Sequence, residues 1–542
     1  MAWRCSPPEK SSLNPWTPCW PRAVAFHDAP RLGQIGKSWA TQLNPELFAI
    51  ESPPRSAALQ FDVKREEGSL GLILSSMRVL AARASAAALV VPMLIGGAVP
   101  ASAAVLSHAM VPAVGSHVRY QYAGALQTLG QVKFNCQVPG RRPLLCYGPD
   151  QMRAAYDVQP LLAAGITGAG KTIVIVDAYQ SPTIESDLAQ FDAAWNIPAP
   201  PHFRIIAPDG LTPFVGTDPN QLGWSSEISL DVEWAHAIAP GANIDLVLAK
   251  SNQDADILSV TEYAVRHRLG DVISQSFGEG ETCMDPKLLS RQHRVFGQAV
   301  QKGITVFASA GDLGSAQPTC DGKSVFKSAS TPASDPNVTA VGGTNLSADA
   351  ASGAYHSESV WNDEFGAGGG GFSTIFERPD YQSGAQHDSS HRGVPDVTYN
   401  GDVRGGVLAA WSAGCGIIVD CGPAGVAFFI FGGTSAGSPQ WAGIIALADQ
   451  KGGHRLGAIN DSLYDIAASE EDYGRAFHDV TAGNNSCTIL VCGISVEGFS
   501  ARAGWDAASG LGSPKVAALV GLLLRKDGEG RQQGEGLQTG GE

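Results

Sequence analysis

The strongest constraint on the fold is a series of five short, apolar runs rich in β-branched residues. They are TIVIVDA (172–178), NIDLVLA (243–249), DVISQSF (271–277), GITVFASA (303–310) and VTAVGG (338–343). Helix-like stretches lie between some of them, at residues 255–269 and 288–303. Apolar runs of this length are typical of strands buried on both faces, and intervening helices are typical of parallel sheets. The pattern predicts an α/β fold in which helices cover both faces of a parallel sheet.

Composition and pattern divide the chain into five segments. The hydrophobic share is 44% of 542 residues, which is enough for a large core. We expect a non-native or disordered extension at residues 1–76, a signal peptide at 77–104, a short and weakly patterned segment at 105–145, one large domain at 146–525 and a disordered tail at 526–542. The extension mixes Trp, Pro and Ser without periodicity, and the tail is rich in Gly, Glu and Gln.

A secretory signal begins at Met77 and reads MRVLAARASAAALVVPMLIGGAVPASAAVLS. Arg78 and Arg83 form a positive n-region, residues 86–99 form an apolar h-region, and Ala101-Ser102-Ala103 is an A-x-A cleavage site. Such a signal works at an N-terminus, so we expect translation to start at Met77 and the product to be secreted. The alternative is a genuine extension followed by a transmembrane anchor.

Cysteine usage agrees with export. Two of the ten cysteines, Cys5 and Cys19, lie in the extension, and the other eight form neighbouring couples. An even number of cysteines in an exported protein indicates disulfides. The nearest-neighbour hypothesis pairs Cys136 with Cys146, Cys283 with Cys320, Cys415 with Cys421 and Cys487 with Cys492. No couple has the spacing of a zinc site.

The string GITGAGKT, residues 165–172, matches the phosphate-binding loop of nucleotide-binding proteins. A working loop of this kind follows a buried strand and opens a helix. Here a helix-like stretch precedes the motif, and the buried strand IVIVDA follows it. We therefore interpret the string as a turn that enters the first core strand, and expect no nucleotide ligand. The net charge of -15 likewise argues against a nucleic-acid partner.

The segment FGGTSAGSPQWAG, residues 431–443, is the sharpest local signal for chemistry. Its two leading glycines allow a tight turn, which would place Ser435 where a loop meets a helix, with its own N–H facing an oxyanion. Pro439 suits the first turn of that helix, where its missing N–H is not needed. Ser435 is therefore a candidate nucleophile. The alternative is an ordinary Gly/Ser loop that caps a helix.

A serine nucleophile needs a general base, which in subtilisin-type sites is a histidine oriented by an aspartate. Asp177 ends the TIVIVD run, where subtilisins place that aspartate, but no H-G-T-H motif follows it. His236 lies within EWAHAIAPGA and is not followed by Gly-Thr. We expect His236 to be structural, while a subtilisin-type site would require it to reach Ser435.

Two acids stand in SSEISLDVEWAHAIAPGA, residues 225–242. Glu227 and Asp231 are four residues apart, so on a helix they share one face. The apolar residues between and after them favour partly buried carboxyls, and the alternative is a solvated acidic face. Burial and like charge raise a carboxyl pKa and allow two carboxyls to share a proton. The pair is therefore a candidate acid/base pair.

A third acid, Asp312, follows a buried strand in FASAGDLG, residues 307–314. An aspartate in a small-residue turn is often structural. Beside a nucleophile and kept protonated, it would instead donate a hydrogen bond to an oxyanion.

Taken in order, these motifs resemble the sedolisin family of serine-carboxyl peptidases over roughly residues 146–520. The motifs that carry the resemblance are Glu227-x-x-x-Asp231, Ala-Gly-Asp312 and Gly433-Thr434-Ser435-x-x-x-Pro439. Three further stretches are similar to the family: TPASDPNVTAVGGT (331–344), GGGGFSTIFERPDYQ (368–382) and VPDV (394–397). The resemblance implies a subtilisin-like fold with a parallel sheet of about seven strands.

The resemblance also implies a role for each acid. Ser435 would be the nucleophile and Glu227 its general base, oriented and polarised by Asp231. Asp312 would stabilise the oxyanion together with the N–H of Ser435. An imidazole, with a pKa of about 6.5, is mostly protonated at acid pH and cannot take the serine proton, whereas a carboxylate can. We therefore expect peptide-bond hydrolysis with an optimum below about pH 6.

Partners follow from the same resemblance. We expect protein or peptide substrates, a monomer, and no membrane attachment once the signal is removed. The family contains endopeptidases and tripeptidyl-peptidases, and we predict an endopeptidase with the tripeptidyl activity as the alternative. A catalytically silent binding protein is the alternative from another class, although Glu227, Asp231, Asp312 and Ser435 are all intact. Subsite preference depends on pocket shape, which motifs do not encode.

A structural calcium ion is a further implication. AFHDVTAG (476–483) and ARAGWDAASGLG (501–512) resemble the calcium loops of the family. The implied ligands are the side chains of Asp479 and Asp506 and the backbone carbonyls of Val480, Arg502 and Gly504. The family often has glycine where Arg502 stands, but only a carbonyl would bind there. Calcium prefers six or more oxygen ligands, with waters completing the shell.

One feature departs from the family. Its members usually carry a folded N-terminal propeptide of well over a hundred residues. Here only about 40 residues separate the signal from the catalytic region, which is too few for such a domain. We expect folding without a full propeptide domain, or another form of control.

Overall fold

The β-branched runs of the sequence form the central sheet. The computed structural model describes residues 111–112, 120–125, 134–137, 145–422 and 425–539. Two compact units divide the chain, Met1–Val99 and Pro100–Glu542, and every described residue lies in the second. The expected extension, the signal and the first two cysteines therefore lie outside the described residues.

Within the described residues the central sheet has eight strands, in the order β14, β13, β9, β7, β4, β6, β5, with β17 also paired with β13. Their bounds are β4 Thr172–Ala178, β5 Phe203–Ile206, β6 Asn243–Ala249, β7 Val272–Gln275, β9 Thr305–Ser309, β13 Thr339–Ala348, β14 Tyr355–Val360 and β17 Val397–Asn400. Every pairing is parallel except that of β14 with β13. The expected parallel sheet of about seven strands is confirmed, with β14 added antiparallel at its edge.

The helices have the following bounds: α1 Pro149–Ala155, α2 Gln159–Ala163, α3 Ile184–Trp195, α4 Pro219–Ile238, α5 Asp254–His267, α6 Pro286–Gln301, α7 Gly437–Gly452, α8 Asn460–Ala467, α9 Glu470–Ala476, α10 Ile489–Cys492 and α11 Val516–Thr539. Short 3-10 turns are η1 Asn135–Gln137, η2 Asp380–Gln382 and η3 Thr434–Ala436. Asp218 caps α4 and Asp285 caps α6 by accepting backbone N–H groups of the first turn.

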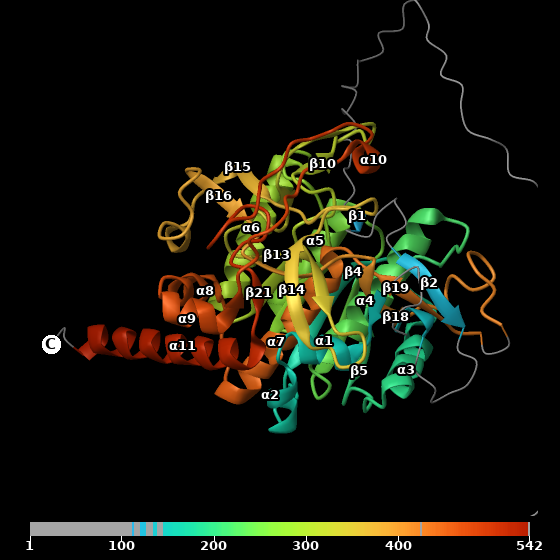
Figure 1. Ribbon diagram of the computed structural model, residues 1–542, viewed down its shortest axis with the longest axis horizontal. Helices are drawn as coiled ribbons and strands as arrows, with labels where there is room; N and C mark the ends of the chain where they lie inside the picture. The colour runs from blue at the N-terminus through green and yellow to red at the C-terminus, as the bar shows by residue number, and fades with distance from the viewer. Residues whose placement is uncertain (1–110, 113–119, 126–133, 138–144, 423–424, 540–542) are drawn as a thin grey trace, which may run out of the picture. The chain divides into compact units, whose positions relative to one another are not determined.

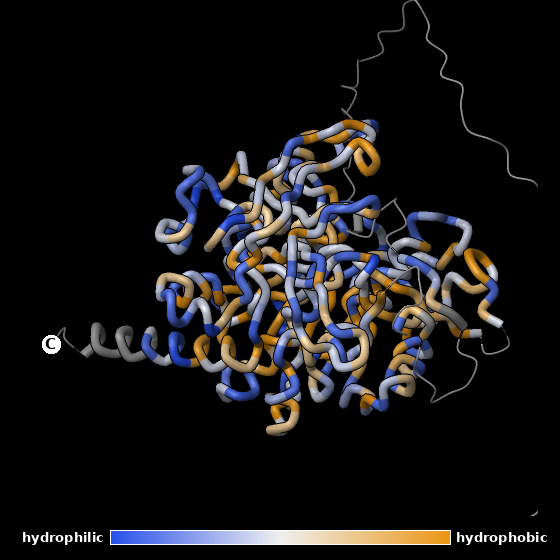
Figure 2. The backbone as a smooth tube through the Cα atoms, in the orientation of Figure 1, coloured by the Kyte–Doolittle hydropathy of each residue, from blue (hydrophilic) through white to orange (hydrophobic). Residues whose placement is uncertain are grey.

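Helices cover both faces of the sheet, as the alternating side chains of β4 require. Ile173 and Ile175 belong to the buried cluster that contains α4 and α7, whereas Val174 and Val176 belong to the cluster that contains α5 and α6. Figure 1 shows these helices around the sheet, and Figure 2 shows the hydrophobic segments gathered in the interior. The expected helix-covered α/β architecture is confirmed.

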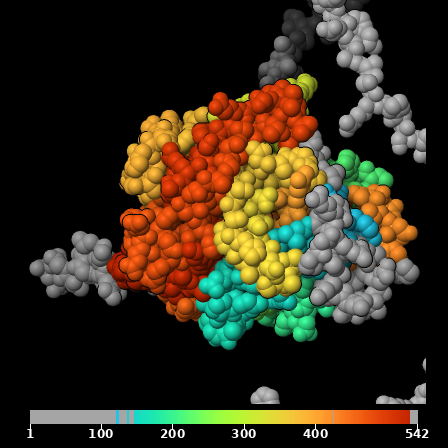
Figure 3. Space-filling model, viewed as in Figure 1, coloured from blue at the N-terminus to red at the C-terminus, as the bar shows by residue number. Residues whose placement is uncertain are grey.

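Smaller sheets surround this core. Their strands are β1 Val111–Pro112, β2 Tyr120–Ala125, β3 Leu145–Tyr147, β8 Phe277–Gly280, β10 Ala316–Pro318, β11 Val325–Lys327, β12 Ser330–Thr331, β15 Gly371–Glu377, β16 His391–Val394, β18 Gly405–Ala410, β19 Ala427–Phe431, β20 Phe477–His478 and β21 Ser513–Pro514. In Figure 3 the yellow β14 region lies beside the orange-red C-terminal region, where Tyr355 stacks on His478 with ring centroids 3.7 Å apart.

The short N-terminal segment contributes strands to the domain. β2 pairs antiparallel with β19, and β3 pairs parallel with β18, so that the segment enters a four-stranded sheet. Tyr120 packs edge-on against Trp411 and Phe429. Because β19 leads directly into the turn that carries Ser435, this segment supports the strand before the candidate nucleophile.

All four nearest-neighbour disulfides are present. They join Cys136 to Cys146, Cys283 to Cys320, Cys415 to Cys421 and Cys487 to Cys492. The first fastens the N-terminal segment to β3, and the last two close small surface loops. Such crosslinks stabilise mainly by restricting the unfolded chain.

The end of the chain differs from expectation. Composition predicts disorder at residues 526–542, but α11 continues through this segment to Thr539. The buried residues Leu519, Val520 and Leu523 anchor the start of the helix, and helix growth from an existing turn is cooperative. Glu, Gln and Arg in the segment also have good helix propensity. In the part of the chain that the structure describes, no helix has the length and hydropathy needed to cross a membrane.

Candidate active site

The turn that carries Ser435 is shaped by glycine. Gly433 has a φ of +94°, and a Cβ there would lie 2.6 Å from Asp312 Oδ2, so that only glycine fits. Thr434, Ser435 and Ala436 form η3, and Pro439 lies in the first turn of α7. Ser435 is fully buried, and among the described residues its Oγ has no hydrogen-bond partner.

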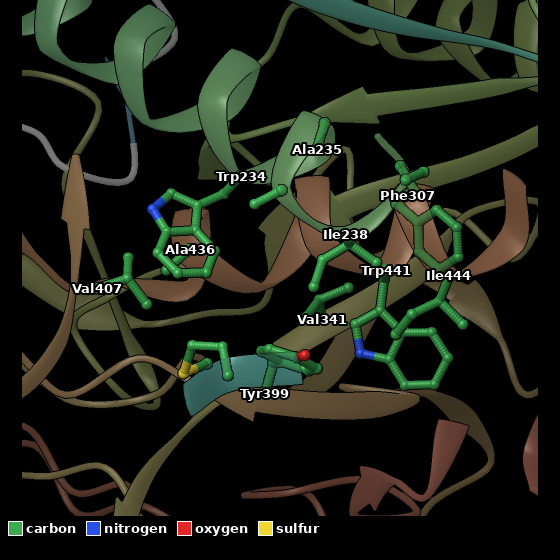
Figure 4. Close-up of a cluster of buried hydrophobic side chains, with 14 of the residues drawn as sticks. Trp234, Ala235, Ile238, Phe307, Val341, Tyr399, Val407, Ala436, Trp441 and Ile444 are labelled. Carbon is green, nitrogen blue, oxygen red and sulfur yellow. The ribbon is translucent and has the colours of Figure 1, made fainter. Parts of the chain in front are cut away.

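The turn that carries Ser435 packs against helices α4 and α7. Figure 4 shows Ala436, the residue after Ser435, within the buried cluster that includes Trp234 of α4 and Trp441 of α7. α4 also packs directly against η3. The nucleophile candidate is thus fixed by two rigid helices and is not on a mobile loop tip.

Asp312 lies against the same turn. It follows β9 and is 4% exposed. Its Oδ1 accepts hydrogen bonds from the Thr434 backbone N at 2.7 Å and from the Thr434 Oγ1 at 2.8 Å. The structure therefore brings Asp312 next to Ser435, although the two are more than a hundred residues apart in sequence.

Glu227 and Asp231 lie on α4 and are both fully buried. Their spacing of four places them on one face of the helix, as predicted. Asp231 Oδ1 accepts a hydrogen bond of 2.8 Å from Ser276 Oγ, at the end of β7. Because α4 packs on η3, the acid-bearing helix and the nucleophile turn are neighbours.

A third carboxyl, Asp177, joins these acids. It lies at the end of β4, is fully buried, and within the described residues neither of its oxygens has a hydrogen-bond partner. Burial and, next, the charge of Glu227 raise the pKa of Asp177 well above its usual range. Burial and, next, the charge of Asp177 raise the pKa of Asp231, while the Ser276 hydrogen bond lowers it. We call Asp177, Glu227 and Asp231 the acid cluster.

The surroundings of Asp177 and Asp231 bear on the chemistry of this arrangement. In the described part of the chain, no cationic side chain forms an ion pair with Asp177 or Asp231. Buried carboxyls without cations hold protons to higher pH than exposed ones, and coupled carboxyls share them. The cluster can therefore accept and release a proton, and α4, which carries two of its members, packs on the turn that carries Ser435.

His236 takes no part in this site. Its Nε2 lies 3.0 Å from the Pro198 carbonyl and 3.2 Å from Asp192 Oδ1, and the ring is fully buried. These contacts tie α4 to α3 and the loop after it. The geometry thus agrees with a structural histidine and gives no support to a subtilisin-type site.

Two residues near the candidates were given no role from the sequence. Thr434 is part of the G-T-S motif, and its position next to Ser435 could have indicated it. Ser276 has no local signal, because its partner Asp231 is 45 residues away and the contact depends on sheet register. Asp177, at the end of the TIVIVD run, was noted in the sequence only because subtilisins place their aspartate at the same position.

The GITGAGKT string is a turn that enters β4, as the sequence indicated. The backbone N–H groups of Thr167, Gly168 and Ala169 all donate to Gln450 Oε1 at the end of α7. Lys171 then leads into β4. The N–H groups that would cradle a phosphate are occupied by a side chain of the domain itself.

The five implied calcium ligands lie on two adjoining loops. Asp479 Oδ2 accepts from the Gly504 N at 3.0 Å, and Asp506 Oδ2 accepts from the Arg502 N at 2.9 Å. Ser509 Oγ lies 3.3 Å from the Val480 carbonyl and 3.1 Å from Asp506, which links the two loops.

Two carboxylates with nearby carbonyls fit a hard cation such as calcium. Burial raises the pKa of Asp506, while hydrogen bonds from backbone N–H groups and from Ser509 lower it. Among the described residues there is no group of three or more His, Cys, Asp or Glu side chains that could hold a metal, so the remaining ligands would be carbonyls and water.

Known proteins share this architecture. The model of the Peptidase S8 family, the subtilase family, matches residues 216–458. Kumamolisin from Bacillus sp. (strain MN-32) is 34% identical over 390 residues, which cover 70% of this chain and 64% of that protein. Sedolisin from Pseudomonas sp. (strain 101) is 29% identical over 400 residues, which cover 71% of this chain and 62% of that protein.

Tripeptidyl-peptidase 1 from Mus musculus is 30% identical over 315 residues, covering 55% of this chain and 52% of that protein. The chain thus spans less than two thirds of the length of these three relatives. A solved structure of Pseudomonas sedolisin, a serine-carboxyl proteinase in complex with pseudo-iodotyrostatin, matches 70% of this chain and 98% of its own length. That match has a TM-score of 0.58 at 26% identity, and the fold is therefore subtilisin-like.

Proposed function

The chain belongs to the sedolisin family of serine-carboxyl peptidases, and on this basis we propose that it hydrolyses peptide bonds in proteins at acidic pH. Ser435 is the proposed nucleophile, Glu227 the general base, Asp231 its orienting partner and Asp312 the oxyanion acid. The observation that carries the proposal is the meeting of three chain segments: the Asp312 carboxyl bonded to Thr434, the η3 turn with Ser435, and the acid-bearing helix α4 packed on that turn.

In the proposed acylation step, Ser435 Oγ attacks the scissile carbonyl carbon while Glu227 takes the hydroxyl proton. The carbonyl π electrons move to the oxygen, which becomes an oxyanion. The tetrahedral intermediate then collapses, Glu227 returns its proton to the leaving amine, and the acyl group stays on Ser435. Asp231 and Asp177 share protons with each other and with Glu227 during this step, so the total number of protons on the acid cluster is the same before and after it.

Asp312 has a geometry suited to oxyanion stabilisation. Both donors of Thr434 reach the same oxygen, Oδ1, so a proton of the neutral carboxyl is carried by the other oxygen, Oδ2. That proton is the proposed donor to the oxyanion, together with the Ser435 N–H. Asp312 can donate this hydrogen bond only while it carries a proton, so the proposed role favours acid pH.

Deacylation is proposed to follow the acylation steps in reverse order, with water in place of the amine as the nucleophile. Glu227 removes a proton from the water as it attacks the ester carbon, and the proton is returned to Ser435 Oγ as it leaves. Both steps need Glu227 ionised and Asp312 protonated at the same time. Such a condition gives a bell-shaped pH profile on the acid side of neutrality.

We assign calcium a structural role. The side chains of Asp479 and Asp506 and the carbonyls of Val480, Arg502 and Gly504 would hold it, and its charge would neutralise two carboxylates where the loops adjoin. None of these residues belongs to the proposed catalytic set. Chelation is expected to lower the melting temperature by several degrees, and an Asp506→Asn variant should show no further drop on chelation, as differential scanning calorimetry would measure.

The central test uses secreted full-length protein and its Ser435→Ala variant with casein between pH 3 and 8. We expect wild-type activity to peak below about pH 6 and the variant to lose at least about a thousandfold of it. Mass spectrometry of the products separates the proposed endopeptidase from a tripeptidyl-peptidase, the activity that the names of several similar proteins carry. A Ser435→Ala protein that digests casein as well as wild type would refute the proposed nucleophile.

A further inference from the structure

β8 has an antiparallel neighbour on each of its two edges. One edge pairs with β12, and the other pairs with β1, where Val111 lies opposite Gly278 and Pro112 opposite Phe277. β1 is two residues long and comes from the N-terminal segment, far from β8 in the sequence. Without β1, this edge of β8 would present unpaired N–H and C=O groups. An edge of that kind binds an extended peptide by adding it to the sheet as a further strand.

The edge that β1 occupies borders the proposed catalytic residues. Ser276, the residue before β8, donates to Asp231 at 2.8 Å. Phe277 packs on Trp224 of α4 with ring centroids 5.8 Å apart, and Trp224 stands one turn before Glu227. β1 itself packs against both β8 and α4. The occupied edge therefore lies against the helix that carries the proposed general base.

The pairing of β1 with β8 also has a direction. Because the two strands are antiparallel, the C-terminal residue of β1, Pro112, lies at the N-terminal end of β8. That end follows Ser276, the donor to Asp231. A peptide bound in this register would therefore present the bond that follows its paired residues to the acid cluster.

We propose that Val111–Pro112 is an intramolecular inhibitor, which occupies the edge of β8 as the backbone of a peptide substrate would and must leave before a substrate binds. This inference rests on the proposed function, because it takes the edge beside α4 as part of the peptide-binding site. It is a form of control that needs no full propeptide domain.

The two residues of β1 suit this role. Proline restricts the residue before it to extended backbone and valine favours strands, so the dipeptide is close to its bound conformation before it binds. Proline has no N–H, and hydrogen-bonded pairs in an antiparallel ladder alternate with pairs that exchange no hydrogen bonds. Val111 is therefore the one residue of β1 that can exchange both backbone hydrogen bonds with β8. A longer peptide can displace so short a pairing.

Tethering compensates for the short pairing. Residues 113–119 connect β1 to β2, which pairs with β19, and Cys136 is bonded to Cys146. The N-terminal segment is thus held to the domain on the C-terminal side of β1. A short tether gives an effective concentration of about a millimolar, and a free substrate has to compete with it.

The test measures peptide binding by the full chain in a Ser435→Ala background, where neither the peptide nor β1 is hydrolysed by the proposed nucleophile. The probe is a fluorescein-labelled casein peptide, and its anisotropy is titrated with protein at about pH 4.5. Val111→Pro removes the one N–H of β1 and keeps the backbone extended. We expect it to bind the probe at least about threefold more tightly than the parent, because more molecules have a free edge on β8.

Val111→Ala is the matched control, because it changes the same side chain but keeps the N–H. It should bind the probe within about twofold of the parent. Equal affinities in the parent and Val111→Pro, or an equal gain in Val111→Ala, would overturn the intramolecular inhibitor.

A synthetic peptide tests the same pairing without any change to the protein. Its sequence is that of residues 107–116, SHAMVPAVGS. At about millimolar concentration it should displace the casein probe from the Ser435→Ala protein, whereas the same peptide with proline in place of its valine at position 111 should not. Equal displacement by the two peptides, or none by either, would contradict the proposed pairing.

The casein assay of the Ser435 enzyme separates this inference from the proposed function. Tighter probe binding by Val111→Pro, together with no casein hydrolysis by wild type, would refute the proposed function but keep Val111–Pro112 as the occupant of a peptide-binding edge. Casein hydrolysis by wild type, together with equal probe affinities in the parent and Val111→Pro, would refute the inhibitor alone.

Discussion

Asp396 and Asp231 are both fully buried aspartates, and their surroundings differ completely. Asp396 accepts from the Arg392 guanidinium at 2.7 and 2.5 Å, from the Tyr464 hydroxyl at 2.9 Å and from the Ala340 N at 2.8 Å. Asp231 accepts a hydrogen bond from Ser276, and burial and its neighbour Asp177 raise its pKa. Asp396 thus has a fixed cationic partner, whereas Asp231 has a carboxyl neighbour and one hydroxyl donor.

The difference separates a structural polar region from a chemical one. A buried charge is tolerated when a counter-charge and hydrogen bonds replace water, and Asp396 has both. A buried acid without a cation is costly to ionise, and proteins keep such groups where a proton must move. The packing of the acid-bearing helix α4 on the Ser435 turn is the reason to connect that cost with catalysis.

Breaking the Arg392–Asp396 ion pair is expected to have the largest effect on stability. Arg392→Met leaves Asp396 buried without its cation and should reduce the free energy of unfolding by about 3–5 kcal/mol. Urea unfolding at pH 5 in the Ser435→Ala background measures it. Arg455→Met, which removes a partly exposed partner of Asp271, is the control and should cost about 1 kcal/mol or less. Equal losses in the two variants would contradict the assigned difference.

Asp231→Asn should give the opposite result in the acid cluster. Ser276 can still donate to the amide oxygen, so the fold is kept, and the unfolding free energy should be unchanged or higher. Peptidase kcat/KM should fall by about 10²–10³-fold, because Glu227 loses its ionisable partner. Asp396→Asn is the control, since it should lose stability but keep activity per folded molecule. If Asp231→Asn lost stability and kept activity, the cluster would be structural.

Stability should fall as pH rises from about 4 to 8. Burial raises the pKa of Asp254 and Asp449 from 3.8 to about 7 and that of Asp402 to about 8. The folded state therefore holds protons that the unfolded state has released, and a raised acid pKa favours folding at low pH. Each extra bound proton lowers the unfolding free energy by about 1.4 kcal/mol per pH unit. Denaturant unfolding at pH 4.5, 6 and 7.5 measures the slope, and a rise in stability with pH would contradict it.

The sequence predicted the local elements well because their signals are local. β4 and β6 have the bounds of their apolar runs, Thr172–Ala178 and Asn243–Ala249. The glycine turn before Ser435 and the helical spacing of Glu227 and Asp231 also depend on near neighbours. Each of these rests on backbone geometry within one or two turns, which residue types encode directly.

Contacts between distant segments were not predictable in the same way. The Ser276 bond to Asp231 and the addition of β2 to β19 depend on which strands lie side by side. A shift of one residue in strand register would turn each side chain to the other face. The resemblance to a family supplied the catalytic candidates, and the fold then supplied the neighbours that tune them.

Ser276→Ala makes the smallest and most specific change to the comparison. It removes the hydrogen bond that Ser276 Oγ donates to Asp231, so the pKa of Asp231 should rise further and the acidic limb of the activity profile should move to higher pH. We expect kcat to fall about tenfold with KM unchanged, since one hydrogen bond to a charged group is worth about 1.5 kcal/mol or more. Ser274→Ala is the matched control: Ser274 lies on β7, and its buried Oγ is 2.8 Å from the Ser438 hydroxyl on α7 instead of a carboxyl. A shifted limb in Ser276→Ala alone supports a donor that tunes the acid cluster, whereas equal profiles in both variants would show that Ser276 only packs.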